Sequence, residues 1–208
     1  MLNPTRKETM IDTAAGSSGF PVHTIFHVWK QMCIAARKPV SHLFTATPKG
    51  YEETEYVQDK VYAIDFDEKA VRVARTLNLI AGDGHTNVLH LNTLDYARWV
   101  TVTKDDDWVD TYNEGFKRLK KLKVGADFSH FGFDVLMANP PFAGEVKEGQ
   151  ILSRYELGMK NGKTQKSVSR DILFIERNLN FLKPGGRMAI VLPQGRFNNS
   201  SDKAIREY

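Results

Sequence analysis

Apolar residues in this chain alternate between short continuous runs and longer stretches of helical spacing. Short apolar runs are typical of strands buried in a parallel sheet, and a repeat every three or four residues is typical of a helix with one buried side. The alternation predicts a doubly wound α/β fold, a mainly parallel sheet with helices on both faces. Strands are expected within residues 9–12, 61–65, 87–95, 134–138 and 187–193, and helices within 21–37, 67–80, 108–119 and 171–182.

Two stretches lack a sustained period. Residues 38–60 contain Pro39, Pro48 and Gly50 and predict a loop with room for one short helix. Residues 143–170 are polar, with several glycines and basic residues, and so long a segment inside a domain is usually functional or disordered. We expect a flexible loop that covers a substrate. Beyond residue 193 a loop and a further helix are expected.

The first predicted strand ends at Asp12 and is followed by small residues that include Gly16 and Gly19. Glycines let a ligand approach the backbone, and the start of the next helix offers unpaired N–H groups. This is the order of a nucleotide-binding turn in a doubly wound sheet. The spacing is not Gly-x-Gly-x-x-Gly, which argues against a nicotinamide-dependent oxidoreductase, and a purely structural turn is the alternative.

Acidic and amide residues follow the next two strands. Asp65 ends the strand at 61–65, where an acidic residue commonly binds the hydroxyls of a ribose. Alternatively, Asp65 is a solvated turn residue and Asp67 caps the following helix. Asn92 or Asp95, after the third strand, could contact the edge of an adenine. The basic face of the helix at 108–119 is more typical of solvated surface than of a phosphate contact.

The strand at 134–138 ends in Asn139-Pro140-Pro141-Phe142. Each proline fixes its φ and lacks an N–H, so neither a strand nor a helix can continue through this point. The stiff turn presents an amide and an aromatic ring, which together can hydrogen-bond the edge of a base and stack on its face. The alternative is a structural Asn-Pro turn with Phe142 packed into the core. The turn by itself leaves both interpretations open.

Composition adds mainly exclusions. The 208 residues, 41% hydrophobic and 26% charged, predict one globular domain. No run is long enough to cross a membrane and no signal peptide is evident, so we expect a cytoplasmic protein. Cys33 is the only cysteine, which excludes an internal disulfide and a cysteine-rich zinc site; no metal is expected. A net charge of +4 permits contact with nucleic acid without indicating it.

Residues 12–20, Asp-Thr-Ala-Ala-Gly-Ser-Ser-Gly-Phe, resemble the first motif of adenine-N6 DNA methyltransferases, commonly written D-P-A-C-G-S-G-G-F. Asp65 fits the acidic residue of the second motif, and residues 139–142 fit the fourth. The segment 171–193 resembles the methylation subunit of type I restriction–modification systems. The resemblance covers nearly the whole chain, and its first and fourth motifs are specific together, in this order and separation.

This resemblance implies a Rossmann-like, S-adenosylmethionine-dependent methyltransferase catalytic domain over residues 1–208. Its implied substrate is an adenine flipped out of double-stranded DNA, and its implied partners are a specificity and a restriction subunit, without a membrane. The third motif usually supplies an acid to the cofactor's adenine amine, where this chain has Asn92, whose amide oxygen can still accept. The implied cofactor-binding residues are Asp12, Ala14, Gly16, Gly19, Asp65 and Asn92, and the implied catalytic residues are Asn139, Pro140 and Phe142.

The chain departs from the family pattern at both ends. It begins shortly before the first motif and ends after the fifth strand, so we expect a truncated catalytic domain whose sheet is incomplete at the C-terminal end. Related Asn-Pro-Pro-aromatic turns serve methyltransferases that act on protein glutamine or RNA guanine amines, although those more often carry Tyr where this chain has Phe142. A catalytically silent DNA-binding or assembly fragment is the alternative outside the enzymes.

Overall fold

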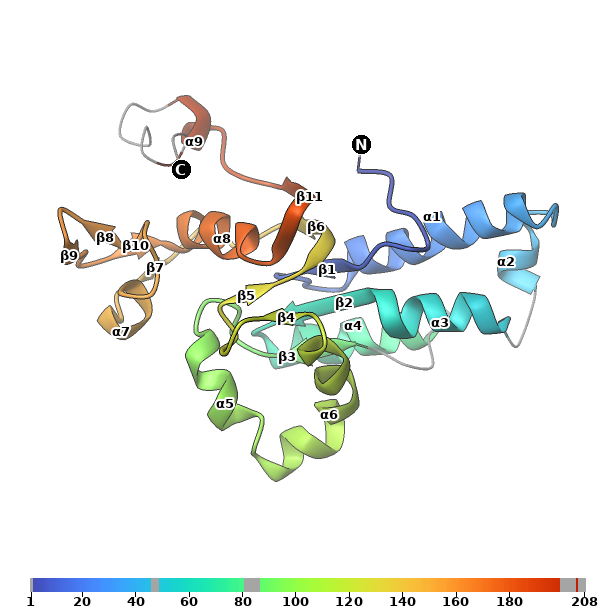
Figure 1. The fold of residues 1–208 in the computed structure, drawn as a ribbon, viewed down its shortest axis with the longest axis horizontal. Coiled ribbons are helices and arrows are strands. Elements are labelled where there is room, and N and C mark those ends of the chain that lie inside the picture. The colour runs from blue at the N-terminus through green and yellow to red at the C-terminus, as the bar shows by residue number, and fades with distance from the viewer. Residues whose placement is uncertain (1, 46–48, 81–86, 199–204, 206–208) are drawn as a thin grey trace.

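The computed structural model describes residues 2–45, 49–80, 87–198 and 205. Five parallel strands form the central sheet, in the order β11-β6-β1-β2-β3 (Figure 1). This confirms the predicted doubly wound, mainly parallel sheet. The five strands are β1 (Met10–Asp12), β2 (Val61–Asp65), β3 (Val88–His90), β6 (Phe133–Ala138) and β11 (Leu182–Ile190).

Helices and short strands connect the sheet. The helices are α1 (Gly19–Ala35), α2 (His42–Thr45), α3 (Tyr51–Lys60), α4 (Glu68–Ile80), η1 (Tyr96–Arg98), α5 (Trp99–Val102), α6 (Asp106–Lys120), α7 (Gly149–Leu152), α8 (Arg170–Leu179) and α9 (Gly195–Asn198). The short strands pair two by two and are β4 (Lys123–Val124) with β5 (His130–Phe131), β7 (Glu145–Val146) with β10 (Val168–Ser169), and β8 (Met159–Lys160) with β9 (Lys163–Thr164).

The order of the strands reverses at the centre of the sheet. The chain passes from β1 outward to β2 and β3, and then returns to β6 and β11 on the other side of β1. Ligands of open α/β sheets bind in the crevice beyond the carboxyl ends of the two strands at such a switch point. In this chain those two strands are β1 and β6, which end at Asp12 and Ala138.

Alternate residues of the strands enter two separate cores. Met10, Val61 and Val135 pack on one face with buried residues of α1 and α3. Ile11 and Leu136, their neighbours along the strands, pack on the other face with residues of α6 and α8. Because both faces of the inner strands are covered, these strands are mainly hydrophobic, which is why they appear as apolar runs in the sequence. The edge strand β11 is half-buried or exposed along its length.

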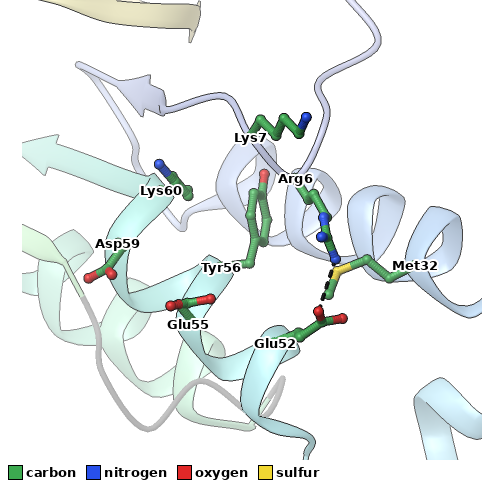
Figure 2. Close-up of a pocket in the computed structure, with 8 residues that line it drawn as sticks. All are labelled: Arg6, Lys7, Met32, Glu52, Glu55, Tyr56, Asp59 and Lys60. Carbon is green, nitrogen blue, oxygen red and sulfur yellow. Dashed lines mark ion pairs between the residues drawn. The ribbon is translucent and has the colours of Figure 1, made fainter.

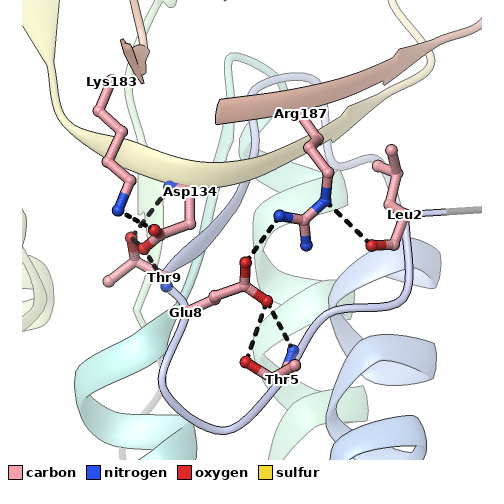
Figure 3. A network of polar contacts seen from close by, with 7 residues as sticks. All are labelled: Leu2, Thr5, Glu8, Thr9, Asp134, Lys183 and Arg187. Carbon is pink, nitrogen blue, oxygen red and sulfur yellow. Dashed lines mark hydrogen bonds and ion pairs between the residues drawn. The ribbon is translucent and has the colours of Figure 1, made fainter. Parts of the chain in front are cut away.

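A polar network fastens the edge strand β11 at the amino ends of the inner strands (Figure 3). Arg187 Nη1 donates to Glu8 Oε1 at 2.7 Å. Asp134 Oδ2 accepts from the backbone N–H and the hydroxyl of Thr9 at 2.8 and 2.9 Å, and Lys183 forms an ion pair with Asp134. The network ties β11, β6 and the segment before β1 together at the end of the sheet away from the switch-point crevice.

Residues 51–60 form a full helix, α3, where the sequence predicts a loop with at most one short helix. Only Tyr56 and Val57 of this helix are buried. An apolar side of two adjacent residues produces no periodic pattern, so the helix is invisible to sequence reasoning. Residues 183–186, Lys-Pro-Gly-Gly, are of the kind that ends a helix, and the sequence predicts a helix up to residue 182. In the structure α8 ends at Leu179, Leu182 already pairs in β11, and the pairing register shifts between Leu182 and Arg187.

The sequence predicts that the helix at 67–80 buries a side made of Ala70, Val71, Ala74, Leu77 and Leu79, and this prediction is only half right. Val71 and Ala74 are fully buried, but Leu77 and Leu79 are 41% and 63% exposed. Asn78 is buried between them, with its amide 3.3 Å from the hydroxyl of Ser18. Val71, Ala74 and Asn78 thus share the inward side, and the Asn78 amide joins this side to the turn after β1.

The polar segment 143–170 contains defined short elements, β7, α7, the β8–β9 hairpin and β10. Its predicted flexibility stays a prediction, as does the assignment of the whole chain to one catalytic domain. The helix expected after residue 193 is represented by α9, and the rest of that expectation lies mostly outside the described residues.

Candidate functional site

The turn after β1 places the predicted residues Asp12, Ala14, Gly16 and Gly19 at the switch point. Asp12 is buried, and its Oδ1 accepts from the backbone N–H of Ala14 at 3.1 Å. Gly16 has a φ of +51°, a conformation that glycine adopts without strain. A side-chain carbon placed on Gly16 or Gly19 would meet no atom within 4 Å, so there is open space beside both backbones.

Ser18 precedes α1 with a φ of 69°, and its side chain does not cap the helix. The first N–H groups of α1 therefore lack a side-chain acceptor at the end that faces the switch point. An uncapped helix end beside open space suits the polar or anionic part of a ligand.

Asp65 joins the turn after β1 to the end of β2. Its Oδ2 accepts from Gly16 N at 2.8 Å and its Oδ1 accepts from Asp67 N at 2.8 Å. Each carboxylate oxygen keeps a further lone pair, so the same group could also accept from ribose hydroxyls. The structural and the ligand-binding interpretations of Asp65 are thus compatible.

Asn92 is more strongly committed to its own turn. Its Oδ1 accepts from Leu94 N at 3.0 Å and from Asp95 N at 3.3 Å, and its carbonyl accepts from Trp99 Nε1 at 2.8 Å. The oxygen expected to accept from an adenine amine therefore already stabilises the loop. The cofactor-binding role of Asn92 stays a prediction.

The Asn-Pro-Pro-Phe turn follows β6 directly. Asn139 is exposed and Pro140 is buried, and no described residue makes a hydrogen bond to the Asn139 side chain. Phe142 is 49% exposed, so its ring is not packed into the core as the structural alternative requires. Val191 N donates to Ala138 O at 3.0 Å, which holds the strand straight up to the start of the turn.

The strand register brings these groups to one edge of the sheet. Asp12 pairs with Ala63 in β2, and Ile11 pairs with Leu136 in β6. Asp65 therefore lies two residues beyond the residue of β2 that is opposite Asp12, and Asn139 lies two residues beyond the residue of β6 that is opposite Asp12. Since neighbouring strands lie about 5 Å apart, these two side chains start roughly 10 Å from each other.

Sequence reasoning missed a buried network behind the turn. Thr13 Oγ1 donates to Asn178 Oδ1 at 2.6 Å, and Thr93 Oγ1 donates to Thr13 O at 2.6 Å. Arg177 Nε donates to Thr93 O at 3.0 Å. Arg177 and Asn178 are fully buried on α8. Polar residues of a helix are usually exposed to solvent, so the sequence gives no sign that Arg177 and Asn178 are buried.

The guanidinium of Arg177 is enclosed by carbonyls and rings. Its Nη2 donates to Phe128 O at 2.8 Å, and its Nη1 donates to the carbonyl of Ser129. The ring centroids of Phe181 and Tyr96 lie 4.3 and 4.6 Å from its central carbon. Burial lowers the pKa of Arg177 to about 10, which leaves the group charged at neutral pH.

Burial raises the pKa of Asp12 to about 7; the Ala14 N–H opposes this effect and the nearby Asp65 charge adds to it. A folded pKa above the unfolded value contributes stability that is complete below about pH 4 and is lost as the pH rises to about 7.

We expect Asp12→Asn to raise the free energy of unfolding at pH 8 by up to about 4 kcal/mol, with little gain at pH 4. Urea unfolding at both pH values measures this, and the exposed Asp110→Asn is the control. A gain independent of pH would contradict it.

Two hollows lie near these elements without including a predicted site residue. One of about 770 Å³ is lined by Phe20, Met137 and neighbouring residues of α1 and the N-terminal segment. The other, of about 390 Å³, lies beside α3 at the amino ends of the strands and includes the buried Tyr56 hydroxyl (Figure 2). Within the described ranges, no cluster of His, Cys, Asp and Glu could hold a metal ion, and no helix is long and apolar enough to cross a membrane.

The model of the Eco57I restriction-modification methylase family matches residues 59–208. No curated protein matches the chain. A modification subunit assigned to a type I restriction enzyme of Vibrio vulnificus YJ016 superposes with a TM-score of 0.59 at 20% identity, over 99% of this chain and 34% of that one. The EcoKI M protein gives 0.57 at 17% identity, over 99% and 34%.

The type ISP enzyme LlaBIII bound to DNA gives a TM-score of 0.61 at 16% identity, over 96% of this chain and 13% of that one. At these identities the likeness concerns the fold. The chain spans about a third of the length of the two type I subunits.

Proposed function

The chain belongs to the Eco57I restriction-modification methylase family, and we propose that it transfers the methyl group of S-adenosylmethionine to N6 of adenine in DNA. The observation that carries this proposal is the turn after β6. It presents an exposed Asn139 amide and a half-exposed Phe142 ring next to the switch point. An exposed amide and aromatic ring on a stiff turn are what recognition of a flipped base requires.

The residues at the switch point fit the cofactor. The open space beside Gly16 and Gly19 leaves room for a ligand against the backbone. S-adenosylmethionine carries two positive charges, on sulfur and on its amino group, and the acidic Asp12 and Asp65 lie at the same edge. Asp12, Ala14 and the two glycines would hold its methionine part, Asp65 its ribose and Asn92 its adenine. When bound, the cofactor supplies an electrophilic methyl group.

The chain's own residues would then prepare the adenine amine. The N6 lone pair is delocalised into the ring, which makes it a poor nucleophile. The Asn139 side-chain oxygen and the Pro140 carbonyl would accept hydrogen bonds from N6, which favours tetrahedral geometry and directs the lone pair at the methyl group. Positioning of this kind can lower a barrier by about 7 kcal/mol or more. The proton can leave after transfer, so no strong general base is needed.

Phe142 would stack on the adenine once it has left the duplex. Flipping a base costs a few kcal/mol of lost stacking and pairing, and stacking on an aromatic ring offsets part of it, about 1–3 kcal/mol. The 49% exposure of this ring leaves a face available for the base.

The proposed partners are duplex DNA and the specificity and restriction subunits of a restriction–modification system, and the reaction would take place in the cytoplasm. The folds of the type I modification subunits and of the DNA-bound LlaBIII support this assignment. Incubation of the chain with labelled cofactor and duplex DNA, followed by analysis for N6-methyladenine, tests it. Transfer to protein glutamine or RNA guanine instead of DNA would contradict the proposal.

Cofactor affinity tests the role of Asp65 separately. Because its carboxylate would bind both ribose hydroxyls, we expect Asp65→Ala to raise the Kd for S-adenosylmethionine by about 10-fold or more, as loss of a charged hydrogen-bond acceptor predicts. Titration calorimetry measures this, with the exposed Asp110→Ala as control. An unchanged Kd in a folded Asp65→Ala variant would remove Asp65 from the site.

A further inference from the structure

Besides the basic end of α6, the chain has a second basic stretch without acidic residues. Residues 157–170 contain Lys160, Lys163, Lys166 and Arg170 and no acidic residue. These four charges equal the formal net charge of the entire chain, +4. All four side chains are exposed, and Lys160, Lys163 and Lys166 line a hollow of about 640 Å³ together with Asn161, Thr164, Gln165 and Ser167.

Three of the four basic residues belong to or adjoin a tight β-hairpin. β8 and β9 are joined by Asn161 and Gly162, with φ of 52° and 73°, the conformation of a two-residue hairpin turn. Lys160 pairs directly with Lys163 across the strands. Like charges in this position destabilise a hairpin, so the pair has no structural benefit. A bound anion between or beside them would relieve the repulsion.

The base of this hairpin is held firmly. Glu176 of α8 accepts from Glu156 N and Leu157 N, both at 2.8 Å. Tyr155 is buried, and its hydroxyl donates to Leu94 O at 2.7 Å, in the loop that follows β3. These bonds connect the hairpin to α8 and to the carboxyl edge of the sheet, so its lysines are positioned by the fold.

Gly158, the residue before β8, is in close contact with Leu152, the last residue of α7. A side-chain carbon at this position would lie 2.1 Å from the carbonyl oxygen of Leu152, so only glycine fits. Gln165, just after β9, closes the hairpin from the other side, since its N donates to Gly158 O at 2.9 Å.

The hairpin also lies on the side of the sheet where the candidate site is. It sits between β7 and β10, which pair with each other, and β7 begins three residues after Phe142. Figure 1 shows β7 to β10 and α7 beyond the end of the sheet opposite to α3, where β1, β2 and β6 end. We propose that the β8–β9 hairpin binds the phosphate backbone of duplex DNA beside the flipped adenine, an inference that rests on the proposed function.

The chemistry of the hairpin favours phosphate over an acidic protein surface. Its exposed residues are lysine, asparagine and threonine, which donate hydrogen bonds to phosphate oxygens. Stable protein interfaces have an apolar centre with aromatic residues. None of the exposed large hydrophobic residues of the described chain falls within residues 157–170.

Salt-dependent DNA binding tests this inference. The variant Lys160→Gln/Lys163→Gln/Lys166→Gln removes three charges from the hairpin. A matched control, Lys69→Gln/Lys104→Gln/Lys121→Gln, removes three charges from exposed lysines on other elements. Fluorescence anisotropy with a labelled DNA duplex is recorded for the full chain and both variants between about 50 and 200 mM salt.

We expect the hairpin variant to lose about 10-fold or more in affinity and to flatten the plot of log K against log salt concentration by about 3, because each lysine that no longer binds a phosphate lowers the slope by about one. The control should change the slope by less than one. Equal losses in both variants, or no duplex binding by the unmodified chain at 50 mM salt, would overturn the inference. So would equal or tighter binding of polyglutamate, which would identify an acidic protein as the partner.

Calorimetric titration with S-adenosylmethionine keeps this result apart from the proposed function. If the unmodified chain does not bind the cofactor, the methyltransferase proposal is wrong, but the measured effect of the hairpin lysines on DNA binding is unaffected. The hairpin variant should bind the cofactor as the unmodified chain does, which also shows that it is folded.

Discussion

Asn139→Ala is expected to lower the rate of DNA methylation by about 100-fold or more while S-adenosylmethionine binds with nearly unchanged affinity. The amide oxygen would stabilise N6 as its geometry changes during transfer, and removal of one such group typically costs about 2.7–4 kcal/mol of transition-state stabilisation. The side chain has no hydrogen-bond partner among the described residues, so its loss should not disturb the fold. Single-turnover transfer and titration calorimetry measure the two quantities.

The matched control is Asn113→Ala, on α6, which packs against the edge strand β3. Methylation by this variant should equal that of the unmodified chain. Full activity of Asn139→Ala would show that Asn139 does not contact the amine. A parallel loss of cofactor affinity would show instead that Asn139 belongs to the cofactor site.

Arg177→Met is expected to lower the free energy of unfolding by about 3 kcal/mol or more, because each buried carbonyl left without its donor costs about 1–3 kcal/mol. The carbonyls of Thr93, Phe128 and Ser129 would lose their donor in a site that water does not reach. Methionine roughly preserves the length of the side chain, so the loss reports mainly the unpaired carbonyls. Urea unfolding at pH 7 measures it.

Arg72→Met is the control for that experiment. Arg72 forms an exposed ion pair with Glu68 on α4, and such pairs contribute about 0–1 kcal/mol. A similar small change in both variants would mean that the network around Arg177 adds little to stability. If Arg177→Met is too unstable to purify, Arg177→Lys retains a charge with fewer donors and should give an intermediate loss.

The central strands and the turn after β6 could be predicted because their causes are local. β2 and β6 are apolar apart from Asp65 and Asp134, as expected of strands covered on both faces. Pro140 and Pro141 end the strand by their covalent structure, whatever surrounds them. The glycine turn at 16–19 and Asp65 follow strands so directly that their place at the carboxyl edge is a consequence of parallel pairing.

Contacts between distant segments could not be predicted. α3 has too few buried residues to show a period, and the buried Asn78 of α4 has its partner in Ser18, sixty residues earlier in the chain. Arg177 and Asn178 are polar residues of an amphipathic helix. Buried Arg177 donates to carbonyls of two other loops, and buried Asn178 accepts from the hydroxyl of Thr13. The hydrogen bonds that Asn92 Oδ1 accepts from Leu94 N and Asp95 N likewise form only when the loop is folded, so the sequence does not reveal them.

The sequence by itself determined the alternation of strands and helices and the stiff Asn139–Phe142 turn, because short-range sterics and apolar periodicity act within a few residues. Only the tertiary structure decided that Phe142 remains half exposed, that Asp12 is buried with a raised pKa, and that the β8–β9 hairpin lies beyond the same edge of the sheet. Burial, desolvation and charge concentration depend on which distant segments meet. The strand order and the strand register determine which segments are in contact, and no local sequence pattern encodes this order or register.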